Sequence, residues 1–370
     1  MSGSLVIDGS HGEGGGQILR TSLTFASLRR RRVRIENIRA SRRRPGLAAQ
    51  HITAIRAAAA LCDAAVAGDE LGSLALDFAP RSPARAGCYA FDVAAAREGG
   101  SAGAASLVMQ TVLLPLALVD GDSRVTVEGG THMAWSPSFD YLKEVWLPAL
   151  ARLGVEGHLT LERSGWFPVG QGRIQAEIDG RRGPLAACDL THRGTLLEIR
   201  GSAIAANLPS HIPQRMAARA SSLLSGLGCP VRIEPIRVRA ACAGAGTFLT
   251  AHYEELRCGF GALGARGKSS EAVAEEAAES LLQHHASGAA LDAHLGDQIL
   301  AALALADGPS RYTVERITRH LETNAWVVEL FGMADVALDR RDDGTGLVSV
   351  VPGTGGNRDE RALKTARPGD

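Results

Sequence analysis

The sequence predicts an α/β (α+β) fold in which three βαβαββ repeats form a large domain, with a small α+β domain inserted between the second and third repeats. The first observation behind this prediction is an internal repeat. Residues 116–131 match residues 303–318 at 11 of 16 positions. A fainter third copy, residues 31–39, shares the alternation of apolar residues. Repetition of one supersecondary unit indicates that the copies pack against each other to complete a common core.

The second observation is the spacing of the copies. Glu36, Glu128 and Glu315 occupy corresponding positions, and the first two lie 92 residues apart but the last two 187, which leaves 95 residues over. An insertion of that size is large enough for a small domain. We therefore expect a large domain of residues 1–182 and 271–351, an inserted domain of residues 183–270, and a disordered tail of residues 352–370, which has little apolar content.

Each element is assigned from its apolar periodicity, with alternation for strands and longer apolar runs for helices. In the first repeat we expect strands at 5–9, 33–38, 72–79 and 88–94 and helices at 15–28 and 45–62. The expected helices are 105–118 and 138–154 in the second repeat, and 296–306 and 323–332 in the third. The insertion is expected to contain strands at 195–206, 231–238 and 247–254 and a helix at 211–228.

The composition restricts the kind of partner. The 40 basic and 40 acidic residues create no overall field, so a nucleic acid would have to be held by a local patch, and a short terminus is a more natural ligand than a duplex. The six cysteines are scattered without CxxC pairs, which disfavours zinc and indicates thiols in a reducing compartment. The sequence has no signal-peptide pattern and no apolar run of about 18 residues. We therefore expect a soluble, cytoplasmic protein with no membrane partner.

The first candidate site is a glycine-rich loop that leads into a predicted helix. Gly12, Gly14, Gly15 and Gly16 surround Glu13, and such a loop lets backbone amides approach a phosphate at the helix N-terminus. A tight structural turn explains a glycine cluster equally well, and no GK[ST] follows to make a Walker A loop. A carboxylate beside a phosphate would repel it unless a divalent cation lay between them. Glu13 is therefore a candidate ligand for Mg²⁺ or Mn²⁺.

Basic and polar residues follow the next predicted strand of the first repeat. Arg39 and Arg42 lie at the strand end, and Gln50 and His51 lie on the following helix. Paired guanidiniums suit bidentate recognition of a phosphate monoester. A solvated basic loop is the alternative when this segment is considered alone.

His320 follows the corresponding strand of the third repeat, because the repeat aligns Thr318 with Arg39. A lone histidine is usually structural or merely exposed. Equivalent strand ends cluster in a repeat fold, however, so we expect His320 to share a cleft with Arg39. We also expect Thr323 or Asn324 to cap the helix that follows.

The motifs GEGGGQILR, RxxRxxPGLxxQH and HLxTN, in this order, resemble the RNA 3′-terminal phosphate cyclases. The resemblance spans roughly residues 5–335 and includes the insertion. It implies the repeated architecture shared with enolpyruvyl transferases, His320 as the histidine that is adenylylated, and Glu13 as the metal-binding glutamate. It further implies an RNA-end pocket of Arg20, Arg39, Arg42 and Gln50, beside which His51 is a further candidate, and an ATP site of Gln110, Pro137, His294, Asp297 and Gln298.

The resemblance implies an ATP-dependent enzyme that converts an RNA 3′-terminal phosphate to a 2′,3′-cyclic phosphate through a histidine-AMP and an RNA(3′)pp(5′)A intermediate, with Mg²⁺ or Mn²⁺. Its partners would be ATP and RNA, with monomer and homodimer both left open. One departure concerns His294, because the family commonly has a tyrosine there that stacks on adenine. A catalytically inactive ribosome-assembly protein of the same fold is the alternative, which the intact HLETN motif disfavours. Enolpyruvyl transfer has no matching motif.

Overall fold

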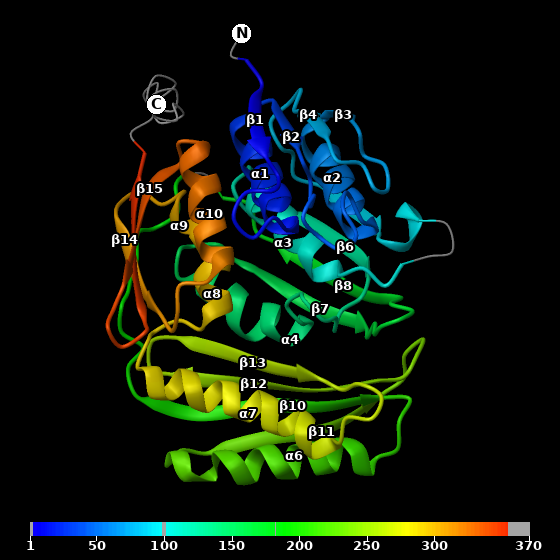
Figure 1. The fold of residues 1–370 in the computed structure, drawn as a ribbon, viewed down its shortest axis with the longest axis vertical. Coiled ribbons are helices and arrows are strands. Elements are labelled where there is room, and N and C mark those ends of the chain that lie inside the picture. The colour runs from blue at the N-terminus through cyan, green and yellow to red at the C-terminus, as the bar shows by residue number, and fades with distance from the viewer. Residues whose placement is uncertain (1–2, 98–100, 182, 354–370) are drawn as a thin grey trace.

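The computed structural model describes residues 3–97, 101–181 and 183–353. In these parts of the chain the fold is mixed α/β, as predicted, with four sheets of four strands each. Figure 1 shows three of the sheets around a central group of helices and the fourth at one end of the molecule. Residues 354–370, most of the predicted tail, lie outside the described residues, so their disorder stays a prediction.

The first sheet has the strand order β1-β2-β4-β3, and β1 pairs parallel with β2. Alternation in β2 buries Val33 and Ile35 against the helices. The elements are β1 (Leu5–Asp8), α1 (Gly16–Arg29), β2 (Val33–Glu36), α2 (Ala49–Cys62), β3 (Ala65–Ala67) and β4 (Leu76–Ala79), which is a βαβαββ unit.

The second sheet has the order β5-β6-β8-β7 and repeats this pattern. The strand expected at 88–94 was assigned to the first repeat, which is wrong, because β5 pairs parallel with β6 in the second sheet. The true third strand of the first repeat, β3, has only three residues and gives no alternation signal. The elements are β5 (Cys88–Asp92), α3 (Ala105–Ala117), β6 (Ser123–Gly129), α4 (Phe139–Tyr141), a π-helical turn (Leu142–Trp146), α5 (Leu147–Ala151), β7 (Gly157–Arg163) and β8 (Gly172–Ile178).

The third sheet has the order β15-β16-β14-β9, and β9 pairs parallel with β14. In all three sheets the fourth strand therefore lies between the second and the third. The elements are β9 (Asp189–Leu190), α8 (Ala293–Gln298), α9 (Leu300–Leu303), β14 (Ser310–Val314), α10 (Arg319–Leu330), β15 (Ala334–Arg340) and β16 (Gly346–Pro352).

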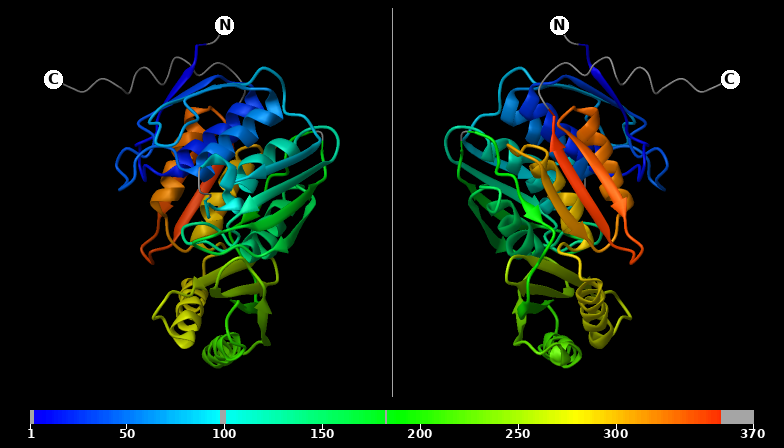
Figure 2. Two further views of the ribbon diagram at one scale, coloured as in Figure 1. Left: turned by 90° about the vertical axis from the view of Figure 1, so that its right-hand side faces the viewer. Right: turned by 90° about the vertical axis from the view of Figure 1, so that its left-hand side faces the viewer.

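The fourth sheet, ordered β11-β10-β12-β13, has its own hydrophobic core with two helices. These helices pack against each other and against the sheet, at the lower end of Figure 1 and in both views of Figure 2. The elements are β10 (Leu196–Ala206), α6 (His211–Leu224), β11 (Val231–Val238), β12 (Gly244–Tyr253), β13 (Arg257–Leu263) and α7 (Ser270–Ser287).

The limits predicted for the inserted domain, residues 183–270, wrongly include β9 and wrongly exclude nearly all of α7. β9 belongs to the third sheet, and α7 packs in the core of the fourth sheet through Val273, Ala277 and Leu281. The chain therefore leaves the third repeat after its first strand and returns at α8. Periodicity missed this arrangement because β9 has only two residues and because an apolar helix face does not say which sheet it covers.

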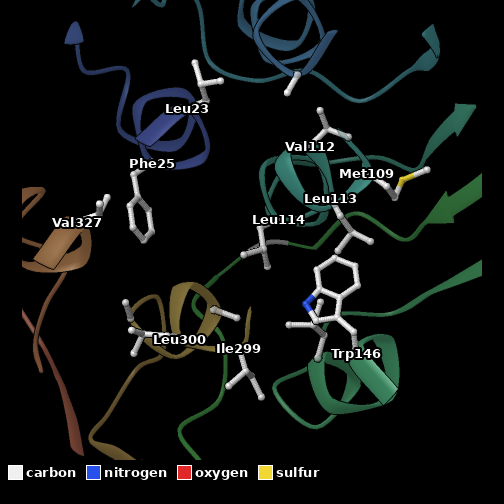
Figure 3. Packing of buried hydrophobic residues seen from close by; sticks show 14 of the residues in the cluster. Leu23, Phe25, Met109, Val112, Leu113, Leu114, Trp146, Ile299, Leu300 and Val327 are labelled. Atoms are coloured by element: carbon white, nitrogen blue, oxygen red, sulfur yellow. The ribbon is translucent and has the colours of Figure 1, made fainter. Parts of the chain in front are cut away.

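Helices from different repeats share one core. Leu23 and Phe25 of α1, Leu114 of α3, Leu300 of α9 and Val327 of α10 belong to a single buried cluster, and Figure 3 shows them around a common interior. This packing brings together residues that are some 300 positions apart in the sequence, such as Gln17 and Asn324. None of the helices in the described ranges is long and apolar enough to cross a membrane.

Candidate active site

His320 lies in the first turn of α10. The helix is capped by Thr318, whose hydroxyl accepts a hydrogen bond from the backbone N–H of Leu321 at 3.1 Å. The expectation that Thr323 or Asn324 forms this cap is wrong, because the helix already begins at Arg319 and both residues lie inside it. The side chain of His320 is 49% exposed, so a substrate can reach the imidazole.

The glycine loop is attached to α10 through Thr323. The Thr323 hydroxyl accepts a hydrogen bond from the backbone N–H of Glu13 at 3.0 Å and donates one to the carbonyl of Arg319 at 2.6 Å. Gly12 has a φ of +59°, and a Cβ there would lie 2.5 Å from the Thr323 Oγ1. Only glycine permits both the conformation and the close approach. The loop thus holds Glu13 beside α10.

Glu13 faces both His320 and Arg42. Its Oε2 lies 3.7 Å from the His320 Nδ1, and its Oε1 forms an ion pair with the guanidinium of Arg42. Arg42 also donates a hydrogen bond to the Glu13 carbonyl at 3.1 Å. The Glu13 carboxylate is only 15% exposed, and its Oε2 is buried without a hydrogen-bond partner. An unpaired buried carboxylate oxygen is costly, so this atom is suited to a ligand that supplies positive charge.

The environment of His320 favours its neutral form. Burial of part of the ring and the positive charges of Arg20 and Arg42 lower the pKa of His320 below its ordinary value, with a further contribution from His294. A neutral imidazole has a lone pair for nucleophilic attack, whereas the imidazolium has none. At neutral pH His320 therefore has the protonation state that a nucleophile needs.

Arg20 of α1, Arg39 and His51 of α2 form a basic cluster, and the charge of Arg20 also acts on His320. We call this cluster the anion pocket. Burial, together with the charges of Arg20 and Arg39, lowers the pKa of His51 to about 3, so this imidazole stays neutral. Its Nδ1 accepts a hydrogen bond from the Ala48 N–H at 3.0 Å. The proton is therefore on Nε2. A Cβ on Gly16 would lie 2.4 Å from that nitrogen and 2.8 Å from the Arg20 Nη1, so both donors crowd the start of α1.

A second pocket adjoins Arg20 on the side of α3 and α8. Gln110, Asp297 and Gln298 line it together with Trp146. The Gln110 amide donates to the Gln298 carbonyl oxygen at 2.6 Å. Burial raises the pKa of Asp297 to about 8, with Arg20 opposing the shift, so at neutral pH the acid is mostly protonated and can donate a hydrogen bond.

Asn324 links the helices that form these two pockets. Its carbonyl oxygen accepts hydrogen bonds from the Thr21 hydroxyl at 2.8 Å and from the Gln17 amide at 3.2 Å. Its amide donates to the backbone carbonyl of Asp297 at 2.9 Å. Asn324 is buried, so these contacts form away from solvent, and the Gln17 amide also donates to the Thr21 hydroxyl at 3.2 Å. The HLETN segment thus joins the first repeat to the third.

Other predicted site residues have side chains that contact the protein itself. Arg39 donates to the Gly46 carbonyl at 2.6 Å, and the Gln50 side chain accepts a hydrogen bond from the Ala104 N–H at 3.0 Å. His294 is exposed and meets Tyr141 edge to face, with 6.5 Å between ring centroids. Pro137 lies in the loop before α4.

The contacts of Glu13, Arg20, Arg42 and His320 occur in a chain that matches a known family. The family model described as RNA 3′-terminal phosphate cyclase matches residues 11–338. The chain belongs to this family. The RNA 3′-terminal phosphate cyclase of Methylococcus capsulatus is 59% identical over 346 residues, which cover 94% of this chain and 96% of that protein. Membership therefore places the chain among enzymes of the ligase class.

Two more distant cyclases match over similar lengths. That of Nostoc punctiforme is 50% identical, with 91% of this chain and 96% of that protein covered. That of Archaeoglobus fulgidus is 40% identical, with 88% and 94% covered. Among solved structures, the enolpyruvyl transferase NikO from Streptomyces tendae is 14% identical, with 96% of this chain and 66% of that chain covered and a TM-score of 0.25.

In the candidate site, Glu13 is the described residue whose carboxylate best suits a divalent cation. Among the described residues, no three His, Cys, Asp or Glu side chains gather as a metal cage. Mg²⁺ in nucleotide sites is usually bound by one or two carboxylates, the substrate phosphates and water, rather than by a protein cage. The buried, unpartnered Oε2 of Glu13 fits that arrangement.

Several residues of the candidate site were not predicted from the sequence. Gln17 donates from its amide to Asn324 and accepts from the Arg20 Nη2 at 2.7 Å, so it orients a guanidinium of the anion pocket. Trp326 stacks on His11 of the glycine loop, with ring centroids 4.0 Å apart. Position in the motifs was the available signal for Gln17, which follows the last glycine directly, whereas no periodicity pairs His11 with Trp326.

Proposed function

We propose that this protein uses ATP to convert the 3′-terminal phosphate of RNA into a 2′,3′-cyclic phosphate, with His320 carrying AMP between the two substrates. The observation that carries the proposal is the neutral imidazole of His320, 3.7 Å from the carboxylate of Glu13 and near Arg20 and Arg42. A nucleophile surrounded by guanidiniums suits attack on a phosphoryl group. The names of the relatives, which describe cyclases, support the same reaction and not the inactive alternative.

In the first step His320 attacks the α-phosphorus of ATP. The Nδ1 faces Glu13, so we assign the attack to Nε2, with the 3.7 Å separation shortening when substrate is bound. The new N–P bond replaces the bond from the α-phosphorus to the bridging oxygen, and pyrophosphate leaves. The ring proton on Nδ1 stays near the carboxylate, which offsets the positive charge that develops on the imidazole.

The adenosine of ATP would occupy the pocket of Gln110, Asp297 and Gln298 next to Arg20. Protonated Asp297 and the two amides supply donors and acceptors for a base or ribose. A divalent cation held by Glu13 would offset the charge of the phosphates during transfer. Arg20 keeps its charge there, since burial lowers its pKa only to about 10.

In the second step the RNA 3′-phosphate takes AMP from His320. The pocket of Arg20, Arg39 and His51 offers two guanidiniums and an imidazole N–H for that phosphate, and Arg42 adjoins it through Glu13. A phosphate oxygen attacks the phosphorus of AMP, the N–P bond breaks, and His320 returns to its neutral form. The product is RNA(3′)pp(5′)A.

In the third step the neighbouring ribose 2′-hydroxyl attacks the 3′-phosphorus, and AMP leaves. Nucleophile and electrophile belong to one ribose, so proximity supplies much of the rate. We assign no general base to this step.

The test is an assay with three oligoribonucleotides that differ only at the 3′ end. With ATP and Mg²⁺ or Mn²⁺, we expect a 3′-phosphate end to become cyclic and a 3′-hydroxyl end to remain unchanged. A 3′-phosphate on a terminal 2′-deoxynucleotide should stop at the adenylylated RNA, because it lacks the attacking hydroxyl.

Two variants assign the chemistry to the residue. His320→Ala should abolish both products, whereas His158→Ala, which removes an exposed histidine on β7, should leave them unchanged. Cyclic ends formed by His320→Ala at the wild-type rate, or no cyclic ends from the wild-type protein, would refute the proposed function.

A further inference from the structure

Two neighbouring loops carry exposed aromatic side chains. Trp135, in the loop before α4, is 99% exposed, and Phe167, between β7 and β8, is 73% exposed. We call Trp135 and Phe167 the aromatic rim. The other exposed large apolar side chains of the described residues are aliphatic and less exposed, as Leu197 on β10 is at 52%. Exposed aromatic residues on two loops that are joined to each other indicate a binding surface more strongly than a single exposed apolar residue does.

Hydrogen bonds hold the two loops together. The backbone N–H groups of Thr131 and His132 both donate to the carbonyl of Gly165, at 2.9 and 3.1 Å. The Thr131 hydroxyl accepts a hydrogen bond from the Gly165 N–H at 2.9 Å. Trp166, between these contacts and Phe167, is buried and stacks on His132 with ring centroids 4.5 Å apart. The base of the rim is therefore rigid, while its two aromatic rings point to solvent.

The loops of the rim are connected to Gln50, the neighbour of His51 in the chain, through residues 101–104. A Cβ on Gly130 would lie 2.6 Å from the Ala102 carbonyl, and one on Gly170 would lie 2.9 Å from the Ala102 Cα, so both loops pack on this segment. The other side of the segment is held by Gln50, which accepts the hydrogen bond from the Ala104 N–H. Gln50 precedes His51 of the pocket. A continuous series of contacts thus runs from the anion pocket to the rim.

The backbone of Trp135 is strained. Its φ is +64°, in the left-handed region that bulky side chains rarely adopt. Burial of the indole does not offset this strain, since the ring is almost fully exposed. Strain that persists without packing in return is typical of residues that act on a ligand.

We propose that the aromatic rim stacks on the bases of the nucleotides that precede the RNA 3′ end. This inference rests on the proposed function for the location of the terminal phosphate. The chain has equal numbers of acidic and basic residues and therefore no overall field that would attract the body of the RNA. Stacking on aromatic rings holds single strands without that attraction, and it tolerates any sequence because every base has a π-face.

The test is direct binding, without ATP, of a fluorescently labelled oligoribonucleotide with a 3′-phosphate. Trp135→Ala and Phe167→Ala should each raise its Kd about 5- to 100-fold. Trp135→Phe should restore most of the affinity, because a phenyl ring also stacks. Leu197→Ala, which removes an exposed apolar side chain on β10, is the matched control and should bind like the wild type.

A single nucleoside 3′-monophosphate separates the rim from the anion pocket. It has no preceding base, so Trp135→Ala should leave its Kd unchanged, measured by competition. Equal weakening of both ligands would overturn the proposal, and so would unchanged binding of the oligoribonucleotide.

Two further results would assign the rim to another occupant and overturn the proposal. One is a raised KM for ATP in self-adenylylation of Trp135→Ala, which would indicate stacking on adenine. The other is a change in oligomeric state, which would indicate contact with a second copy. Failure of the proposed function would appear separately, as wild-type protein that does not become adenylylated when incubated with ATP. The binding assay contains no ATP and therefore gives its result in either case.

Discussion

The replacement Thr323→Val tests whether the glycine loop must be fixed to α10 for His320 to react. The Thr323 hydroxyl makes two hydrogen bonds, a donor bond to Arg319 within the helix and an acceptor bond from Glu13 across 310 residues of sequence. Valine has nearly the same shape and removes both. The bond within the helix affects stability, whereas the bond to Glu13 positions the carboxylate beside the imidazole.

The matched control is Thr53→Val in α2. The Thr53 hydroxyl is also buried and donates to the carbonyl four residues earlier, at 3.0 Å, but it makes no bond to another segment. The difference between the two variants isolates the bond to Glu13. One such bond contributes about 1–2 kcal/mol when its loss leaves the N–H without a partner. This free energy corresponds to roughly a 5- to 30-fold change in an equilibrium constant.

The assay is the rate at which each variant takes label from α-labelled ATP, with thermal unfolding measured in parallel. We expect Thr323→Val to react up to roughly 5- to 30-fold more slowly than Thr53→Val at a similar loss of stability. Equal rates for the two variants would refute the reasoning, because the loop would then need no attachment to α10.

Three further predictions concern the pockets. Gly16→Ala places a Cβ 2.4 Å from the His51 Nε2, so binding of 3′-phosphorylated RNA should weaken in an anisotropy assay, whereas Gly226→Ala, with no atom within 4 Å, should bind normally. The pKa of Asp297 is raised to about 8, so the affinity for ATP should fall as the pH rises through that value and the carboxylate forms. Asp297→Asn should remove this pH dependence. A Kd of the wild type for ATP that stays constant up to about pH 9 would contradict the prediction. The pKa of His320 lies below its ordinary value of 6.5, so the rate of self-adenylylation should decline only on acidification below that pH, and a decline already at higher pH contradicts the environment described for the imidazole.

The sequence was sufficient for the class and the repeated pattern, but not for the short elements. The long apolar runs of α1, α3 and α10 gave their helices directly, and the match between residues 116–131 and 303–318 gave the equivalence of β6 and β14. β3 and β9, with three and two residues, carry no periodicity and become strands only through the sheets they join. Missing β3 placed β5 in the wrong repeat, and missing β9 placed the start of the insertion too early in the chain. The end of the insertion was placed too early because the sequence does not show that α7 packs on the fourth sheet.

The candidate site divides in the same way. Strand ends that align in the repeat predicted a cleft shared by His320 and Arg39, and this stays a prediction. The structure places His320 beside Glu13 of the glycine loop. Roles that depend on tertiary contacts were not predictable. Thr323 was expected to cap a helix, yet it holds the glycine loop, because its distance from Glu13 exists only after α1 and α10 pack.

Mass spectrometry of the protein after incubation with ATP and Mg²⁺ tests the central claim most directly. Cleavage after Arg319 and Arg340 releases residues 320–340, a peptide in which His320 is the sole histidine. At neutral to alkaline pH, which preserves a phosphoramidate, we predict that this peptide carries one AMP and loses it on acidification or when 3′-phosphorylated RNA is added. AMP found on another residue, or a peptide that stays unmodified while cyclic RNA ends accumulate, would contradict the account.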